Sequence, residues 1–175
     1  MEKVIFLDID GVLQPLWFQN RFQHDLEALK KTFIEERGVE FSIVDKYDLG
    51  AVNFDWYEES VSYLKKLCEI CGADIVLSSM WREGRTLKEM QLLFSLHNLD
   101  VYLKDFTEYL DGKRDLEIQT YLGKHPEIKY FVIFDDVLSY GLGEAFPENF
   151  IHCKGFLNEE NFKKAGKILS CEGKL

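Results

Sequence analysis

The chain has 175 residues, of which 46% are hydrophobic and 30% are charged, and only three are proline. This composition is that of a globular protein with a sizeable core, and the length predicts a single domain over residues 1–175. The formal net charge of −10 argues against broad, non-specific binding of nucleic acid, because neutralising phosphates requires many Lys and Arg residues. A local basic site, or a metal ion that supplies positive charge, is compatible with it.

No segment has the character of a signal peptide or a membrane span. The apolar run at Met1–Leu7 is too short for a signal sequence and is ended by Asp8, and no apolar stretch approaches the roughly 20 residues that cross a bilayer. We therefore expect a cytoplasmic protein whose four cysteines are reduced thiols. Cys68 and Cys71 form a C-x-x-C pair on the apolar face of a predicted helix, without a second Cys/His pair at ligand spacing. Packing is thus favoured over redox or zinc chemistry.

Short apolar runs alternate with helical patterns along the chain. Strand character is found at Val4–Ile9, Asp74–Leu77, Asp100–Leu103, Tyr130–Phe134 and, more weakly, Phe150–Cys153. Apolar residues recur at helical spacing in Tyr57–Cys71, Thr86–Leu96, Asp115–Leu122 and Glu159–Leu169. Strands that alternate with helices predict parallel βαβ units with right-handed crossovers. Helices cover both faces of such a sheet, which is why its strands read as continuous apolar runs. The expected fold is a Rossmann-like, three-layer α/β parallel sheet.

Residues 14–56 depart from this pattern, because they are far more numerous than an ordinary connection between a strand and a helix. The segment contains a helical stretch, Phe18–Arg37, that is rich in Phe, Leu and charged residues. We interpret it as a small cap insertion, folded over the sheet edge where the first strand ends. The aromatic residues that flank it are expected to pack it down, or alternatively to stack on a substrate base; they are Trp17, Phe18, Phe22, Phe54 and Trp56.

Polar residues follow three of the predicted strands. They are Asp8 and Asp10 after the first strand, Ser78 and Ser79 after the second, and Asp135 and Asp136 after the fourth. Ligands of an open parallel sheet bind beyond the carboxyl ends of its strands, so these side chains are expected to converge. Lys113 and Arg114 open the helix that precedes the fourth strand, a position that is unfavourable for cations unless they have another task.

Carboxylates gathered in one crevice repel one another, and they coexist if a divalent cation binds them. Oxygen ligands favour a hard ion that retains water molecules, which makes Mg²⁺ the expected cofactor. A cation beside hydroxyl groups suits the equatorial oxygens of a phosphoryl group. One aspartate could then attack phosphorus as a nucleophile, and a second aspartate, two residues on, could handle the proton.

At these residues the chain resembles the haloacid dehalogenase-like (HAD) phosphohydrolase superfamily. The resemblance rests on FLDIDGVL as motif I, IVLSSMWR as motif II, a basic residue in GKRDLEI as motif III and VIFDD as motif IV. The subtype is similar to the HAD domains associated with RNA-repair proteins, in which a serine-rich strand end followed by Trp-Arg, an Arg-x-x-Glu-Ile helix start and a double aspartate recur. The segment CKGFLNEENFKKAGKIL also resembles the C-terminal part of that group.

The resemblance implies roles for the acidic residues. Asp8 would be the nucleophile that forms an aspartyl-phosphate. Asp10 would protonate the leaving group and then activate water, while its backbone carbonyl touches Mg²⁺. Asp136 would be the metal-binding acid of motif IV, with Asp135 beside it, so that the metal set is Asp8, Asp10, Asp135 and Asp136. Gly11 would let the chain turn sharply under the substrate.

The resemblance also implies a set of phosphate-binding residues, with two choices open. Ser79, or alternatively Ser78, would hold a phosphoryl oxygen. Arg114, or alternatively Lys113, would neutralise the phosphoryl charge and hold the nucleophile. Arg82 would bind substrate phosphate bidentately, or alternatively pair with a surface acid.

The sequence therefore predicts a Mg²⁺-dependent phosphatase that hydrolyses a phosphomonoester through an aspartyl-phosphate. Its partner would be a phosphorylated small molecule, a nucleotide or a nucleic-acid end rather than a membrane, and the oligomeric state is left open. The alternatives are a polynucleotide end phosphatase and a non-catalytic HAD-fold module that binds a partner through its insertion. The complete set of Asp8, Asp10 and Asp136 argues against a module without catalysis, which has no need to keep that charge repulsion.

Overall fold

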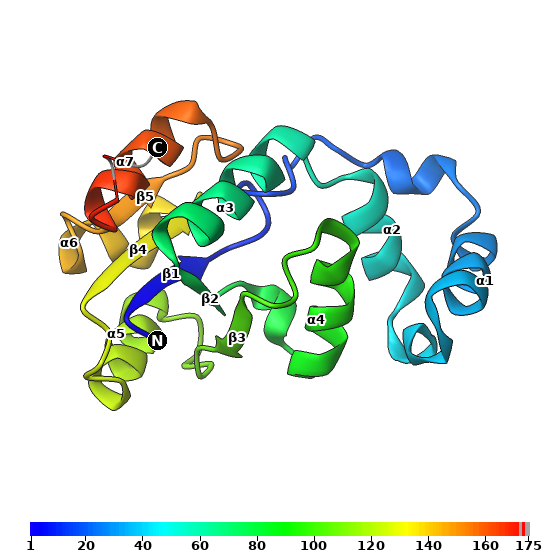
Figure 1. The fold of residues 1–175 in the computed structure, drawn as a ribbon, viewed down its shortest axis with the longest axis horizontal. Coiled ribbons are helices and arrows are strands. Elements are labelled where there is room, and N and C mark those ends of the chain that lie inside the picture. Colours follow the sequence, from blue (N-terminus) through cyan, green and yellow to red (C-terminus); the bar gives the residue numbers. More distant parts are fainter. Residues whose placement is uncertain (172, 174–175) are drawn as a thin grey trace.

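The structure is a computed structural model that describes residues 1–171 and residue 173. Within them, the strands form one parallel sheet in the order β3-β2-β1-β4-β5 (Figure 1). Their bounds are β1 (Lys3–Leu7), β2 (Asp74–Leu77), β3 (Leu103–Phe106), β4 (Tyr130–Asp135) and β5 (Phe150–His152). Strand β1 lies at the centre, where Phe6 is in register with Val76 of β2 and Ile133 of β4. The predicted parallel α/β sheet is confirmed.

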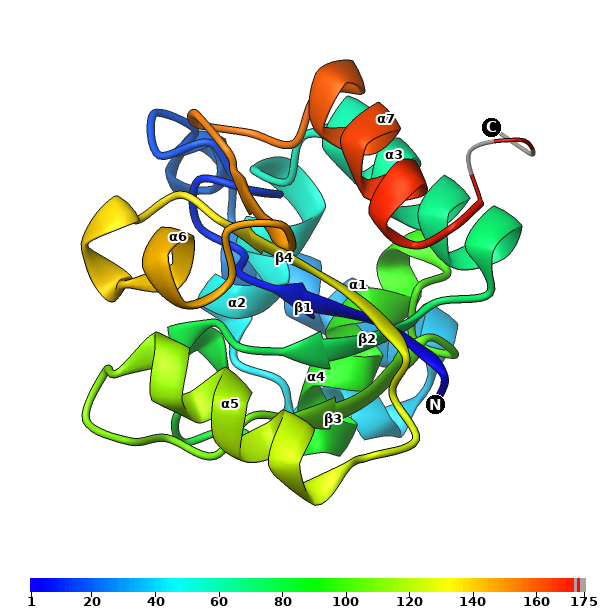
Figure 2. The ribbon, with the colours of Figure 1, turned by 90° about the vertical axis from the view of Figure 1, so that its left-hand side faces the viewer.

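Helices cover both faces of the sheet (Figure 2). Their bounds are α1 (Leu26–Arg37), α2 (Lys46–Phe54), α3 (Glu58–Cys71), α4 (Leu87–Phe94), α5 (Arg114–Lys124), α6 (Leu142–Ala145) and α7 (Glu159–Ile168), and the 3₁₀ turns are η1 (Asn20–Gln23), η2 (Val39–Ile43), η3 (Met80–Arg82), η4 (Ser95–His97) and η5 (Leu138–Tyr140). Successive side chains of a strand point to opposite faces. Accordingly, Ile5 and Leu7 of β1 pack with α3, α4 and α7, whereas Val4 and Phe6 pack with α5 and α6.

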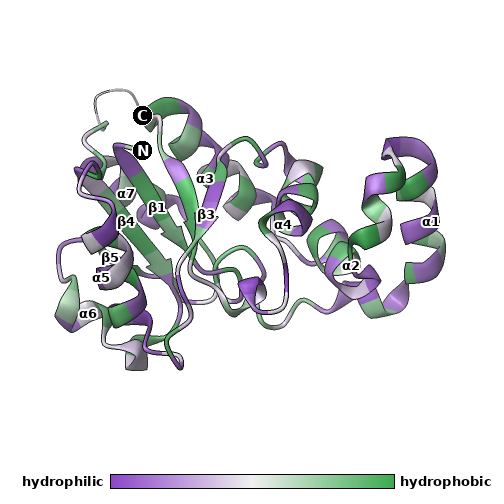
Figure 3. Cartoon of the chain, turned by 90° about the horizontal axis from the view of Figure 1, so that it is seen from below, coloured by the Kyte–Doolittle hydropathy of each residue, from purple (hydrophilic) through white to green (hydrophobic). Residues whose placement is uncertain are grey.

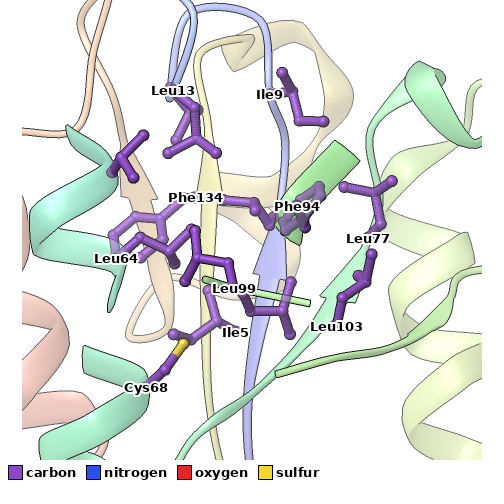
Figure 4. Close-up of a cluster of buried hydrophobic side chains, with 14 of the residues drawn as sticks. Ile5, Ile9, Leu13, Leu64, Cys68, Leu77, Phe94, Leu99, Leu103 and Phe134 are labelled. Atoms are coloured by element: carbon purple, nitrogen blue, oxygen red, sulfur yellow. The ribbon is translucent and has the colours of Figure 1, made fainter. Parts of the chain in front are cut away.

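The larger core lies on the α3 side of the sheet. Ile5 of β1 and Phe134 of β4 meet Leu64 of α3 there, and Phe94 of α4 completes the cluster (Figure 4). All four side chains are fully buried. Because apolar residues fill both faces, β1 carries no charged side chain between Val4 and Leu7, and its first acid, Asp8, comes where the strand ends.

Residues between β1 and α3 form η1, α1, η2 and α2. Helix α2 packs on α4, and α1 packs on the outer side of α2, so this segment extends to one end of the molecule (Figures 1 and 3). The predicted helix Phe18–Arg37 is wrong in its first part, because Asp25 interrupts it. The Asp25 side chain accepts hydrogen bonds from the backbone N–H groups of Glu27 and Ala28, which makes it the N-cap of α1.

The third strand begins later than predicted. The sequence pattern indicated Asp100–Leu103, but the observed strand β3 is Leu103–Phe106. Asn98 has a left-handed backbone at φ 57°, and the Leu99 carbonyl accepts from the N–H groups of Tyr102 and Leu103. The chain therefore still turns at residues 99–102, and Val101 is exposed.

The prediction of four reduced cysteines is wrong. Cys71, at the end of α3, forms a disulfide with Cys171, which follows α7. The two helices pack side by side, and the Cα atoms of the two cysteines lie 5.4 Å apart, within the range that a disulfide spans. Cys68 is free and buried in the core, as its place on the apolar helix face predicted. Among the described residues, no helix is both long and apolar enough to cross a bilayer.

Candidate active site

The carboxyl ends of β1 and β4 bring three acids together. One carboxylate oxygen each of Asp8, Asp135 and Asp136 lies within 4.8 Å of the other two. The backbone holds them in place, since the Asp8 N–H donates to the Phe134 carbonyl at 2.9 Å. Asp8 directly follows β1, Asp135 ends β4 and Asp136 follows it, and the two strands are adjacent in the sheet. The arrangement is the kind of oxygen cluster that can hold a divalent cation.

Gly11 allows Asp136 to approach the turn after β1. This glycine has φ +70°, and a Cβ atom placed on it would lie only 2.3 Å from Asp136 Oδ2. The turn itself is closed by hydrogen bonds, among them that from the Gly11 N–H to the Gln14 carbonyl at 2.7 Å. A side chain at position 11 would thus be strained and would also displace the Asp136 carboxylate.

Arg114 is the cation that lies among the acids. Its Nη1 is 2.9 Å from Asp135 Oδ2 and 3.5 Å from Asp8 Oδ1, and its side chain is buried. The other Asp135 oxygen accepts from the Val137 N–H at 2.9 Å. Lys113 is exposed to solvent at the N-cap position of α5. Of the two adjacent basic residues, the structure brings Arg114 to the acids and leaves Lys113 at the surface.

The two serines after β2 face different surroundings. Both backbone N–H groups donate to the Leu7 carbonyl, which ties this strand end to β1. The Ser79 hydroxyl accepts from the Trp81 N–H at 3.4 Å, and it lowers the pKa of Asp8 by hydrogen bonding. The Ser78 hydroxyl is buried without a hydrogen-bond partner in the described part of the chain. Ser79 is therefore the serine that faces Asp8.

The Arg82 guanidinium is hydrogen-bonded to other groups of the protein. Its guanidinium donates to the backbone carbonyls of Ser78, Ser79 and Thr107, and to the carboxylate of Glu117 at 2.6 Å. The side chain is buried. A guanidinium has five N–H donors, so little capacity is left for a phosphate. Arg82 thus fixes the end of β2 against α5, and its predicted contact with substrate phosphate stays a prediction that these bonds disfavour.

Burial and mutual repulsion raise the pKa values of the acids. Desolvation is the main cause for each of them, and it raises the pKa of Asp135 to about 7. The charge of Asp8 further raises the pKa values of Asp10, Asp135 and Asp136. For Asp8 itself, the Arg114 guanidinium acts in the opposite direction and lowers the pKa. Arg114 pairs with Asp8 and Asp135 only, so the four acids together carry more negative charge than their basic neighbours offset.

The donor set fits Mg²⁺. All three clustered groups are carboxylates, and hard oxygen donors suit this ion. Asp136 is only half-buried, which leaves one side of the cluster open to water, and Mg²⁺ retains water ligands. The Asp10 carboxylate is not part of this cluster, and its Oδ2 accepts from the Trp81 indole N–H at 3.0 Å.

Three further residues act on the site and were given no role from the sequence. Trp81 binds Asp10. Arg21, in η1, lowers the pKa of Asp10 through its charge and is held by Asp55 with an N–O distance of 2.7 Å. Glu117 lies 3.5 Å from Arg114 Nε as well as binding Arg82. Trp81 and Glu117 each had a signal in the sequence, the Trp-Arg pair after the serines and the Arg-x-x-Glu spacing at the start of α5; Arg21 had none.

The comparisons with known proteins agree with this geometry. Residues 4–162 match the family model described as "HAD domain in Swiss Army Knife RNA repair proteins". The match covers the strands of the described sheet, apart from Lys3 at the start of β1, and all the acids of the site. No curated protein and no solved structure matched the chain.

Proposed function

Since the chain belongs to the family of HAD domains in Swiss Army Knife RNA repair proteins, and hence to the HAD phosphohydrolase superfamily, we propose that it hydrolyses phosphomonoesters. The proposed reaction depends on Mg²⁺ and passes through an aspartyl-phosphate. The observation that carries the proposal is the convergence of Asp8, Asp135 and Asp136 around Arg114 at the carboxyl edge of the sheet.

Asp8 is the proposed nucleophile of the first step. Its carboxylate oxygen attacks phosphorus, the new Asp8 O–P bond forms, and the P–O bond to the leaving alcohol breaks. Asp10 donates its proton to the departing oxygen. Burial raises the pKa of Asp10, which favours the protonated form that this step requires. Ser79 and Arg114 lie beside the nucleophile, where they can bind the oxygens of the transferring group.

Asp10 acts as a base in the second step. It takes a proton from a water molecule, and the resulting hydroxide attacks the phosphorus of the aspartyl-phosphate. The Asp8 O–P bond breaks, so that inorganic phosphate leaves and the Asp8 carboxylate is restored. The same residue thus gives a proton in one step and removes one in the next, and each cycle returns both aspartates to their initial state.

Asp8 and Asp136 would hold Mg²⁺ through their carboxylates, and Asp10 through its backbone carbonyl. Asp135 lies beside them and is bound to Arg114 and to the Val137 N–H. The ion, when bound, offsets the repulsion among the acids and the negative charge of the phosphoryl oxygens. Without added positive charge, bringing a phosphate dianion to this cluster would be strongly unfavourable.

Residues 14–56 are proposed to act as a cap. The segment starts four residues after Asp10 and contributes Arg21, whose charge acts on Asp10. Its position next to motif I suits a cover that limits substrate size and excludes water during the first step.

A nucleic-acid end is the second candidate substrate, next to a small phosphomonoester or nucleotide. The family description names RNA repair, whereas the net charge of −10 disfavours an extended nucleic-acid interface. Short oligonucleotides with a 3′- or 5′-phosphate, compared with small phosphomonoesters as substrates, would separate these possibilities by their kcat/KM values.

The decisive experiment measures phosphate release from p-nitrophenyl phosphate with and without Mg²⁺. We expect Mg²⁺-dependent turnover that Asp8→Asn lowers by at least about 10³-fold, since the nucleophile is lost. Asp100→Asn, which changes an acid in the turn before β3, is the matched control and should retain activity. If neither this ester nor the oligonucleotide panel is turned over, the non-catalytic binding module becomes the better account.

A further inference from the structure

The Trp81 side chain makes one hydrogen bond to Asp10, the residue that is proposed to act as general acid and base. Its indole N–H donates to Asp10 Oδ2 at 3.0 Å. Indole has one donor and no acceptor, so this hydrogen bond uses its entire polar capacity. Trp81 lies in η3, directly after the two serines of motif II, and 71 residues separate it from Asp10.

The Trp81 ring is fixed from two sides. The Trp56 ring lies against it, with ring centroids 6.3 Å apart. The Arg85 guanidinium lies over it, 5.7 Å from the ring centroid, and also donates to the Trp81 carbonyl at 3.1 Å. An indole held in this way has little freedom to follow a moving partner, so it defines where Asp10 Oδ2 lies.

Arg85 is in turn held by the insertion. Its Nη2 donates to Asp48 Oδ1 of α2 at 2.7 Å, and its Nε donates to the other oxygen of the same carboxylate. Two parallel hydrogen bonds between a guanidinium and a carboxylate fix the relative orientation of both groups. A continuous set of contacts therefore leads from α2 through Arg85 and Trp81 to Asp10.

A carboxylate rotates broadly about its last torsion unless something holds it. A general acid must lie within hydrogen-bond reach of the oxygen that it protonates. With Oδ2 bound to Trp81, the Oδ1 atom of Asp10 is left to give and take the proton. Fixing Oδ2 therefore selects Oδ1 as the oxygen that exchanges the proton and sets the direction in which Oδ1 points.

We infer that Trp81 is a positioning residue for Asp10, and that the pair of Asp48 and Arg85 transmits the placement of the insertion to it. The inference rests on the proposed phosphatase function. It assigns Trp81 no contact with substrate. Its effect on catalysis passes through Asp10 alone.

The test uses Trp81→Phe, which removes the N–H donor and keeps an aromatic ring. We compare kcat/KM for p-nitrophenyl phosphate, whose leaving group needs little protonation, with that for glycerol 2-phosphate, whose alkoxide leaving group needs a proton. The ratio kcat/KM reports the steps up to departure of the alcohol, so it isolates the first use of Asp10. We expect a loss of about 10- to 100-fold for the alkyl ester and less than about 3-fold for the aryl ester.

A tryptophan that only packs would give a different result. Equal losses for the two esters, or no loss for either, would overturn the inference while leaving the phosphatase function intact. A wild-type protein without Mg²⁺-dependent turnover of either ester refutes the proposed function, and this inference with it.

A second variant covers the case in which Trp81→Phe does not fold. Arg85→Gln removes the contact with Asp48 and the cation over the Trp81 ring without changing the indole. We expect the same selective loss for the alkyl ester, of about 3- to 10-fold. Arg37→Gln is the matched control, because it also removes a guanidinium from an aromatic face, that of Phe33 at 5.0 Å. If the two arginine variants behave alike, the proposed transmission from the insertion is wrong.

Discussion

Two adjacent basic residues at the start of α5 have different surroundings. Arg114 is buried between Asp8 and Asp135, whereas Lys113 is exposed. We expect Arg114→Met to lower kcat/KM by about 100-fold or more, because the proposed donor to the phosphoryl group and the partner of two buried acids are lost together. Lys113→Met should change it by less than about 3-fold. Steady-state kinetics on one aryl phosphate would compare them, and a larger loss for Lys113→Met would reverse the assignment.

Gly11 combines backbone strain and steric contact in one position. Gly11→Ala would put a methyl group 2.3 Å from Asp136 Oδ2 at φ +70°. Gly72 has a similar φ of +65°, but a Cβ atom added there would have no neighbouring atom within 4 Å. We expect both alanine variants to lose about 1–2 kcal/mol of unfolding free energy from left-handed strain, measured by urea denaturation. Only Gly11→Ala should also weaken Mg²⁺ binding, and equal Mg²⁺ affinities in the two variants would contradict the contact with Asp136.

The sequence predicts the acids of the site better than their neighbours. Asp8, Asp10 and Asp136 follow apolar strands, so their place at the sheet edge follows from where each apolar run ends. The choice between Ser78 and Ser79 depends on which way a single side chain points, which no pattern reveals.

The contacts of the other site residues could not be predicted, because their hydrogen-bond partners lie far away in the sequence. The bonds of Arg82 to Thr107 and Glu117 join residues distant in the sequence, so no local pattern could predict them. The hydrogen bond from Trp81 to Asp10 is of the same kind.

At the scale of elements, strands with one continuous apolar run were predicted most closely. Strand β2 has the predicted bounds, Asp74–Leu77, whereas β3 is shifted because its apolar run includes a turn. Helix α2 was missed, since its buried residues are four in succession, Leu49–Val52, and give no helical period. The helix is held by its packing on α1, η1 and α4 instead.

The disulfide joins two elements that pack side by side, α3 and the end of α7. It closes a loop with a sequence separation of 100 residues, for which the chain-entropy model gives about 4.7 kcal/mol and native disulfides typically give about 2–5 kcal/mol. We expect dithiothreitol to lower the unfolding free energy by such an amount, measured by urea denaturation. Cys71→Ala should abolish this dependence on reductant, and Cys68→Ala, on the same helix face, should keep it. An equal response of both variants would rule out the pairing.

For the molecule as a whole, the acid cluster couples stability to pH and to Mg²⁺. Burial raises the pKa values of the four acids, that of Asp135 to about 7. An acid whose pKa is higher in the folded protein than in the unfolded chain destabilises the fold when it is ionised. Its contribution to the free energy of unfolding is complete below the unfolded pKa of about 4. The contribution is lost as the pH rises through the folded pKa. The metal-free protein should therefore lose a few kcal/mol of unfolding free energy between about pH 4 and pH 8.

Mg²⁺ should offset this loss, because it binds the ionised carboxylates. We expect the melting temperature, compared between EDTA and saturating Mg²⁺, to rise more at pH 8 than at pH 5. A rise that is equal at both values, or larger at pH 5, would show that the ion does not bind at these acids.

The central claim is that acids at the carboxyl ends of β1 and β4 share one ion. Titration calorimetry of the metal-free protein with Mg²⁺ at pH 7.5 tests this claim most directly. The account predicts one Mg²⁺ per chain, an affinity at least about tenfold lower in Asp136→Asn and in Asp8→Asn, and an unchanged affinity in Asp100→Asn. Binding to Asp136→Asn that equals wild-type binding, or no binding to the wild-type protein, would contradict it.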